Sequence, residues 1–112
     1  YEKIPLNKTL LLGFSQGGAM ALELATRKKF AGVFALSSYP HPEWQPLSDM
    51  PPVFLCHGNM DEVVSKEASK KSFDILIKNG IKSDLYFFQG GHEINNDLIE
   101  HCRKIIKQKF LS

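Results

Sequence analysis

The stretch Gly13-Phe14-Ser15-Gln16-Gly17-Gly18 decides the fold of this chain. It follows the apolar run 9–12 and precedes a helix-forming run, so it predicts a strand, a tight turn and a helix. This is the pattern of a nucleophile elbow, in which a serine occupies a strained, exposed backbone corner. We expect glycine at Gly13 and Gly17 because a side chain there would collide with the flanking strand and helix. Ser15 is therefore the candidate nucleophile.

An acid and a histidine follow two further strand-like runs. Asp61 comes shortly after the apolar run Val53–His57, and His92 follows a run that ends at Phe88. The chain order Ser15, Asp61, His92 is the order of α/β-hydrolase triads and differs from the orders in chymotrypsin and subtilisin. All three are predicted at carboxyl ends of strands, where parallel α/β sheets assemble their active sites. The sequence therefore predicts a Ser-His-Asp triad.

Other polar residues compete for these roles or for a metal. Glu62 is the main rival of Asp61, since a one-residue change of register would bring it toward His92, and Glu93 is a weaker rival. We expect His57 to bond locally at a strand end. We expect the two remaining histidines, His41 and His101, to be solvated. A zinc site is disfavoured because the cysteines and histidines lack closely spaced ligand pairs.

The whole chain alternates strand-like and helix-like segments, which predicts an α/β fold with a parallel sheet and flanking helices. The expected strands are 6–12, 32–37, 53–57 and 84–88, and the expected helices are 18–29, 65–79 and one running from Asn95 or Asn96 to Phe110. Ser65 is expected to cap the second helix, and Gly80 to end it. The apolar stripes expected to face the sheet are Ala68, Phe73, Leu76 and Ile77 on the second helix, and Leu98, Ile99, Cys102, Ile105, Ile106 and Phe110 on the third.

Composition limits the possible classes. The 112 residues form at most one domain, and a formal net charge of +2 gives no reason to expect a nucleic-acid partner. No apolar run approaches the roughly 18 residues that a transmembrane helix needs. Cys56 and Cys102 fall on apolar positions, which favours small core residues over a disulfide. We therefore expect a reducing compartment and a cytoplasmic protein without a cofactor or metal.

With these residues in hand, the chain resembles the phospholipase/carboxylesterase family of α/β hydrolases, which includes acyl-protein thioesterases. The matching stretches, which run over almost the whole chain, are 13–22, 32–37, 57–64 and 90–92. The chain departs from the family pattern at Ser65, where a proline is usual, and in its short turn 90–92. We expect neither departure to touch the chemistry.

The resemblance implies roles for individual residues. It makes Ser15 the nucleophile, His92 the general base and later acid, and Asp61 the group that orients His92. It also implies that the backbone N–H of Gln16 binds the oxyanion. Tyr39 lies where the family places a residue beside the acyl pocket, so we expect it to contact substrate.

Family members are about twice as long as this chain. We therefore expect residues 1–112 to be the C-terminal half of an α/β-hydrolase domain, from the nucleophile elbow through the last helix. The missing half would carry the first strands and the second oxyanion donor. We expect this chain to pair with that half or to self-associate.

The expected function is a serine hydrolase that cleaves carboxylic esters or thioesters, with an acylated protein or a lysolipid as candidate substrates. A non-catalytic fragment or pseudoenzyme that serves as a folded interaction module is the alternative from another class. A serine-directed fluorophosphonate probe distinguishes the two. A second alternative is the small fungal-type serine hydrolase family, which shares the Gly-X-Ser-Gln-Gly segment but has a longer insertion between serine and acid.

Overall fold

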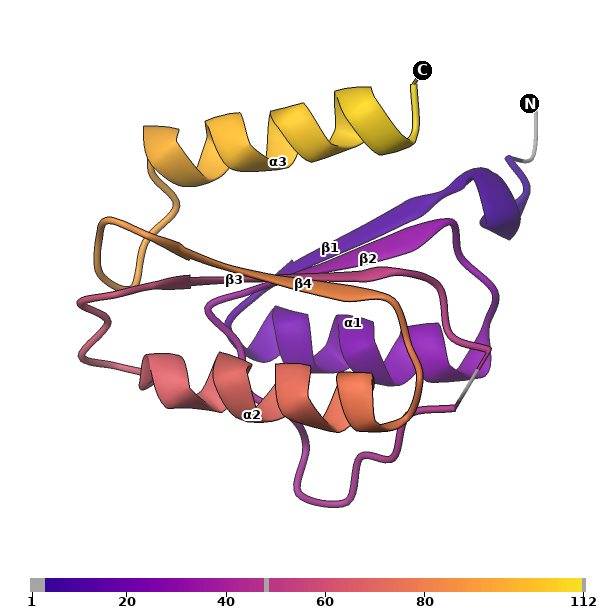
Figure 1. Cartoon of the computed structure of the whole chain (residues 1–112), viewed down its shortest axis with the longest axis horizontal. Coiled ribbons are helices and arrows are strands. Elements are labelled where there is room, and N and C mark those ends of the chain that lie inside the picture. The colour runs from indigo at the N-terminus through magenta and orange to yellow at the C-terminus, as the bar shows by residue number, and fades with distance from the viewer. Residues whose placement is uncertain (1–3, 48, 112) are drawn as a thin grey trace.

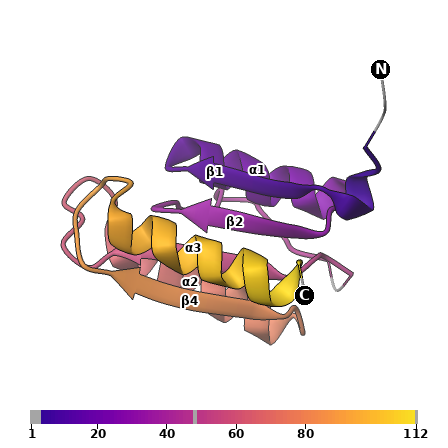
Figure 2. The same cartoon turned by 90° about the horizontal axis from the view of Figure 1, so that it is seen from above.

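The computed structural model describes residues 4–47 and 49–111, which form a parallel four-stranded sheet with the order β1-β2-β3-β4. The strands are β1 (Leu10–Phe14), β2 (Gly32–Leu36), β3 (Val53–Gly58) and β4 (Ser83–Phe88). The helices α1 (Gln16–Arg27) and α2 (Lys66–Lys78) cover one face, and α3 (Asn96–Lys109) covers the other (Figure 1, Figure 2). The predicted fold class, a parallel α/β sheet with flanking helices, is confirmed.

The first strand is shorter than the sequence predicts. Residues Leu6–Lys8 form a 3-10 helix, and the strand begins only at Leu10, so the predicted strand 6–12 is wrong in its first half. The Pro5 carbonyl explains the difference, because it accepts bonds from the Lys8 N–H at 3.0 Å and the Thr9 hydroxyl at 2.9 Å. These local bonds compete with the extended backbone of a strand.

Two hydrophobic clusters hold the layers together. Every residue of β2 and β3 is buried, as expected for central parallel strands that are covered on both faces. The cluster on the α1 and α2 side includes Leu22, Val33, Trp44, Leu55 and Leu76, and the cluster on the α3 side includes Phe34, Phe54, Phe88, Leu98 and Cys102. Each large apolar side chain contributes about 1.5–3 kcal/mol on burial.

The buried face of α2 differs from the predicted stripe. Its buried residues are Ser69, Ser72 and Leu76, whereas Ile77 is 50% exposed. Both serines can be buried because their hydroxyls are bonded. Ser69 bonds to the ring of His57, and Ser72 donates to the Ala68 carbonyl one turn earlier on the same helix. The predicted ends are confirmed, since Ser65 accepts a bond from the Glu67 N–H and Gly80 is left-handed at φ +76°.

The helix α3 begins where the sequence predicts. The Asn95 side chain caps it by accepting the Leu98 N–H at 3.1 Å. Leu98, Cys102 and Ile105 are buried, but Ile99 is 44% exposed and does not belong to the inner face. Cys56 and Cys102 are both buried and free, which agrees with their expected place in the core.

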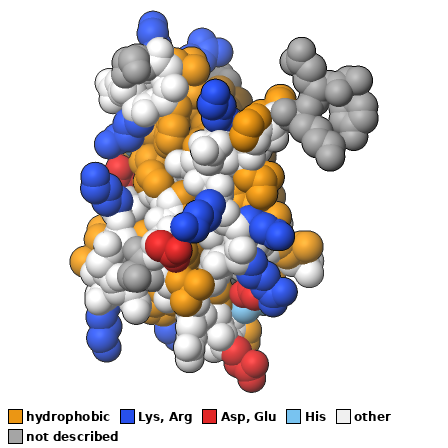
Figure 3. Space-filling model, turned by 90° about the vertical axis from the view of Figure 1, so that its right-hand side faces the viewer, with side chains coloured by type: hydrophobic (Ala, Val, Ile, Leu, Met, Phe, Trp, Pro, Cys, Tyr) orange, Lys and Arg blue, Asp and Glu red, His pale blue; other side chains and the backbone are white. Residues whose placement is uncertain are grey.

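The end of the molecule opposite the carboxyl ends of the strands carries dispersed charge. On the face shown in Figure 3, Lys and Arg side chains alternate with hydrophobic and uncharged ones and do not gather into one patch. Within residues 4–47 and 49–111, no helix is long and apolar enough to cross a membrane.

One edge of the sheet carries exposed apolar side chains. In the described part of the chain, β1 pairs with β2 on one side and has no strand on the other. Around this edge, Leu12 is 57% exposed, Met20 60% and Leu24 42%. An unpaired strand edge of this kind is a template for pairing with another strand.

Candidate active site

Ser15 occupies a strained corner between β1 and α1. Its φ of +57° is rare for a residue with a side chain, and such strain is typical of a nucleophile elbow. The Ser15 N–H donates to the Leu36 carbonyl at 2.7 Å, which ties the corner to the end of β2. Ser15 therefore lies at the carboxyl ends of β1 and β2.

Two positions of the elbow require glycine, and only one of them, Gly13, is among the two that the sequence predicts. A Cβ at Gly13 would lie 2.1 Å from the Gly17 carbonyl oxygen, and one at Gly18 would lie 2.5 Å from the Cβ of Ser38. At Gly17 itself a Cβ would meet nothing within 4 Å. The expected collision is therefore confirmed for Gly13 and wrong for Gly17, and Gly18 is the second constrained glycine.

Gln16 is the first residue of α1, directly after Ser15. The first N–H groups of a helix have no acceptor within the helix, and they lie at the positive end of its dipole. The backbone N–H of Gln16 is thus available to an anionic oxygen bound next to Ser15. The Gln16 side chain is exposed.

Asp61 lies in the loop after β3, where two backbone groups fix its carboxylate. Its Oδ1 accepts the N–H of Val63 at 2.9 Å and the N–H of Val64 at 2.8 Å. Its side chain is 0% exposed. Burial acts to raise the pKa of Asp61, but the bonds from Val64, His92 and Val63 outweigh burial and hold that pKa below its usual value. Asp61 is therefore ionised at neutral pH.

The loop after β4 is joined directly to the Asp61 loop. The Asn59 N–H donates to the Phe88 carbonyl at 3.0 Å, and the Met60 N–H donates to the Gly90 carbonyl at 2.9 Å. This close approach requires Gly58, because a Cβ there would lie 2.3 Å from the carbonyl oxygen of Gly91. These backbone contacts alone place the loop of Asp61 next to the loop of His92.

The structure brings Ser15, Asp61 and His92 into one bonded row. The Nδ1 of His92 lies 2.8 Å from Asp61 Oδ2, and its Nε2 lies 3.1 Å from Ser15 Oγ. The ionised carboxylate can only accept, so Nδ1 carries the ring proton and Nε2 is left to accept the serine hydroxyl. The His92 side chain is 17% exposed, which leaves the row accessible from outside.

The two glutamates that rivalled Asp61 lie outside this row. Glu62 is exposed, whereas its neighbour Asp61 bonds to His92. Glu93 accepts the Gly91 N–H at 2.9 Å and so supports the turn that carries His92. The geometry favours Asp61 as the acid of the site.

Tyr39 and Trp44 line a cavity whose lining residues include none of Ser15, Asp61 and His92. Tyr39 borders a cavity of about 380 Å³ whose other lining residues are Pro40, His41, Pro42, Trp44, Ala68, Lys71 and Ile75. The role of Tyr39 in substrate binding therefore stays a prediction. Trp44 is 7% exposed and donates from Nε1 to the Thr26 hydroxyl at 2.9 Å, so it is part of the core beneath the segment between β2 and β3.

Two residues of the site were not singled out from the sequence as parts of it. The ring of Phe14 packs against that of His92 at a centroid distance of 4.8 Å. His57 was expected to bond locally, but the ring also lies 3.4 Å from Asp61. In the sequence, only position points to these roles, because Phe14 directly precedes Ser15 and His57 comes four residues before Asp61.

The remaining histidines take no part in the site. His101 stacks on Tyr86 at a centroid distance of 3.7 Å, so the expectation that it is simply solvated is wrong. Burial lowers its pKa, against the opposing effect of Asp97. Among the residues that the structure describes, no three His, Cys, Asp or Glu side chains gather as metal ligands.

Comparison with known proteins identifies the class. The fold matches solved α/β hydrolases. The crystal structure of esterase PE8 aligns with a TM-score of 0.85 and 31% identity, over 94% of this chain and 52% of that one. The structure of SOBER1 from Arabidopsis thaliana aligns with a TM-score of 0.80 and 25% identity, over 97% of this chain and 56% of that one.

Sequence comparison then gives the family. A family model described as phospholipase/carboxylesterase matches residues 1–110, and the chain belongs to this family. It is 33% identical to acyl-protein thioesterase 1 homolog 1 of Dictyostelium discoideum, over 96% of this chain and 51% of the relative. It is 31% identical to lysophospholipase-like protein 1 of Mus musculus, over 92% of this chain and 47% of the relative. The chain thus spans about half the length of these relatives.

Proposed function

We propose that this chain carries the catalytic triad of a serine hydrolase that cleaves carboxylic esters or thioesters. The observation that carries the proposal is the bonded row from Ser15 Oγ through the ring of His92 to Asp61 Oδ2. The strained φ of Ser15 supports it, because strain of this kind concentrates at functional sites. The family and its thioesterase and esterase members support the same chemistry.

In the proposed reaction, His92 Nε2 takes the hydroxyl proton as Ser15 Oγ attacks the acyl carbon. The carbonyl π bond breaks and leaves a negative charge on oxygen. When the tetrahedral intermediate collapses, the proton on Nε2 passes to the departing alkoxide or thiolate, and an acyl-serine remains. His92 then removes a proton from water as the water oxygen attacks the acyl carbon of the acyl-serine. When this second tetrahedral intermediate collapses, the bond from Ser15 Oγ to the acyl carbon breaks, Nε2 returns its proton to Oγ, and the acid is released. Asp61 stabilises the imidazolium ion in both halves of the cycle.

The Gln16 N–H is the proposed oxyanion donor from this chain. It stands next to the nucleophile at the start of α1, where the helix dipole also favours negative charge. Oxyanion sites of this fold use a second N–H from a loop after an earlier strand. We propose that the second donor comes from a segment corresponding to the half of the relatives that this chain does not match.

The proposed substrates are esters or thioesters of an acyl chain, carried by a protein or a lysolipid. The names of the relatives support this choice, since they include an acyl-protein thioesterase and a lysophospholipase-like protein. We propose the cytoplasm as the site of action. The two free, buried cysteines support a reducing compartment.

We also propose that the outer edge of β1 is where this chain pairs with another strand. The apolar side chains around it, Leu12, Met20 and Leu24, support this proposal. The same edge is the observation that favours the second candidate, a non-catalytic module whose function is association. In that case the triad residues would be retained without turnover.

Turnover of a short p-nitrophenyl ester and of an acyl thioester by the purified chain tests the proposed function. The measurement is made with and without a polypeptide that supplies the upstream half of a family member. Hydrolysis that depends on Ser15 in either condition supports the hydrolase. Binding of the upstream half without any turnover would favour the non-catalytic module.

A further inference from the structure

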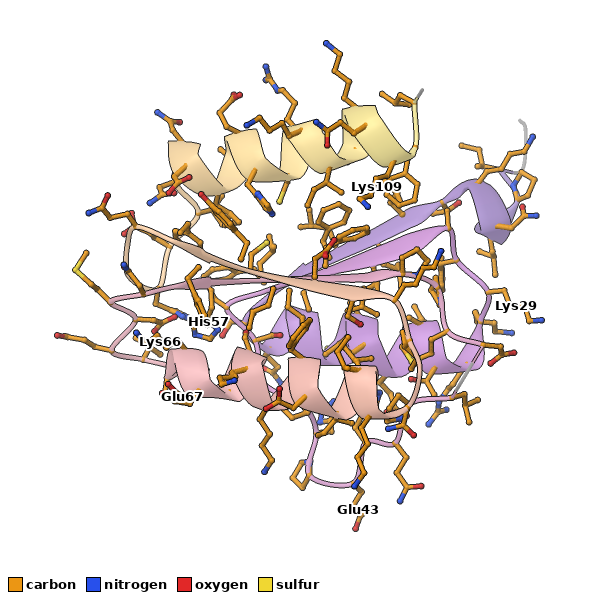
Figure 4. All side chains as sticks on the ribbon, in the orientation of Figure 1. Lys29, Glu43, His57, Lys66, Glu67 and Lys109 are labelled. Atoms are coloured by element: carbon orange, nitrogen blue, oxygen red, sulfur yellow. The ribbon has the colours of Figure 1, made fainter. Side chains whose placement is uncertain are left out.

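His57 is a buried histidine that the proposed reaction does not use. It lies near the end of β3, and its side chain is 0% exposed. Its ring nitrogens contact two other parts of the chain, with Nδ1 at 2.6 Å from Ser69 Oγ and Nε2 at 2.7 Å from the Val64 carbonyl oxygen. Figure 4 shows His57 between the end of the sheet and the first turns of α2.

The partners of His57 determine which nitrogen carries its proton. The carbonyl of Val64 can only accept, so Nε2 must donate. In the tautomer with the proton on Nε2, Nδ1 accepts the hydroxyl proton of Ser69, which is itself 0% exposed. Both nitrogens are satisfied by a ring without charge. The ring is thereby fixed between α2 and the loop that follows β3.

The same nitrogen, Nε2, also lies close to Asp61. It lies 3.4 Å from Asp61 Oδ2, the oxygen that bonds to His92. The Val64 residue that receives the shorter bond from His57 also donates its own N–H to Asp61 Oδ1. His57 therefore lies against the Asp61 carboxylate. It also bonds to Val64, whose N–H binds the other oxygen of that carboxylate.

We propose that His57 is a positioning residue that fixes the rotation of the Asp61 carboxylate so that Oδ2 faces His92. This inference rests on the proposed function of the triad. A neutral ring that donates to Val64 suits the role, because a second cation beside Asp61 would compete with the imidazolium of His92 for the same negative charge. Ser69, on α2, fixes the other side of the His57 ring through its hydroxyl.

The first test is nuclear magnetic resonance of the 15N-histidine-labelled chain, which needs no turnover. The spectra report the tautomer of His57 and the proton between His92 Nδ1 and Asp61. We expect an Nε2–H tautomer at His57 and a strongly downfield His92 proton in the wild type. In His57→Phe we expect that downfield proton to move upfield or to be lost, and in His57→Gln, which can still donate, to be largely retained.

The matched control is His101→Gln, which alters a histidine on α3 that stacks on Tyr86. It should leave the His92 proton unchanged. Ser69→Ala provides a second variant if His57→Phe does not fold, and it should weaken the His92 signal by freeing the ring of His57. An unchanged His92 proton in a folded His57→Phe, or in Ser69→Ala where the former does not fold, would overturn the proposal.

The second test is the reaction of Ser15 with a fluorophosphonate probe. Small misplacements of a catalytic group cost on the order of a hundredfold, so we expect a loss of about this size in His57→Phe and partial rescue in His57→Gln. An equal rate in folded His57→Phe and wild type would overturn the role of His57. A wild type with the downfield proton but no reactive Ser15 would instead contradict the proposed function and leave the positioning geometry standing.

Discussion

The Nε2 of His92 lies 3.1 Å from the Oγ of Ser15, although 77 positions separate the two residues in the chain. The contact exists because the loops after β3 and β4 are joined through Asn59, Met60 and Gly90 and carry His92 across the end of the sheet. No part of this arrangement needs a ligand. The site is therefore formed by the fold itself, which is a condition for electrostatic preorganisation.

Replacement of Ser15 by alanine should abolish ester hydrolysis and preserve the fold. The half-buried side chain contributes chemistry and little packing, so circular dichroism and the melting temperature should stay close to those of the wild type. Loss of a triad nucleophile removes several orders of magnitude in rate. Residual hydrolysis above about a thousandth of the wild-type rate would point to a different nucleophile.

Asp61→Asn should reduce kcat/KM on the order of ten-thousandfold, whereas Glu62→Gln should leave it nearly unchanged. Asparagine keeps the shape of the side chain, but its amide stabilises the wrong tautomer of His92. Glu62 is exposed, while Asp61 bonds to Nδ1 of His92. The measurement is the rate of ester hydrolysis by both variants, and similar losses in the two would overturn the assignment of the acid.

Acid should destabilise the chain partly through Asp61. The pKa of Asp61 is lowered in the folded state because bonds from Val64, His92 and Val63 outweigh the effect of burial. A depressed folded-state pKa gives stability that is present above the unfolded value of about 3.9 and is lost as the pH falls through the folded value. Urea unfolding from pH 6 to pH 2 should therefore show a smaller acid-induced decrease in Asp61→Asn than in wild type.

The control for this pH dependence is Glu62→Gln, which removes an exposed neighbouring carboxylate. Its free energy of unfolding should fall with acid as in the wild type. If the free energy of unfolding of Asp61→Asn fell with acid as steeply as that of the wild type, the Asp61 carboxylate would not be held in its ionised form by the fold.

The exposed edge of β1 should make the isolated chain associate. Sedimentation velocity should show species larger than the monomer, and Leu12→Lys should reduce them by placing a charge at the edge. Ile99→Lys is the control, because Ile99 is similarly exposed but lies on α3.

Without the proposed second oxyanion donor, the chain by itself should hydrolyse esters roughly a hundredfold to a thousandfold more slowly than the chain supplied with the upstream half of a family member. A stable, fully active wild-type monomer would contradict both expectations.

The sequence predicts the parallel sheet and the region of the site because both depend on local patterns. Continuous apolar runs indicate β2 and β3, and the spacing of Gly13, Ser15 and Gly17 indicates a tight turn. The start of β1 was missed because the Pro5 carbonyl binds Lys8 and Thr9 locally. No periodicity in the sequence encodes that competition.

Tertiary partners explain the other differences. Ser69 faces inward on α2 because its hydroxyl bonds to the ring of His57. Ser72 can be buried because its hydroxyl donates to the Ala68 carbonyl of the same helix, although a hydrophobic pattern would place Ile77 inside. His57 contacts Asp61 only because the chain turns back at Val64. Such contacts depend on the path of a loop, which apolar spacing does not determine.

The most direct test of the central claim is to map the adduct of a fluorophosphonate probe on the purified chain by mass spectrometry and to measure its rate of formation. We expect a single adduct on Ser15, formed at least a hundredfold faster in the wild type than in His92→Gln, because the ring of His92 must accept the serine proton. An adduct on another residue, an equal rate in His92→Gln, or a folded wild type that does not react would contradict the account.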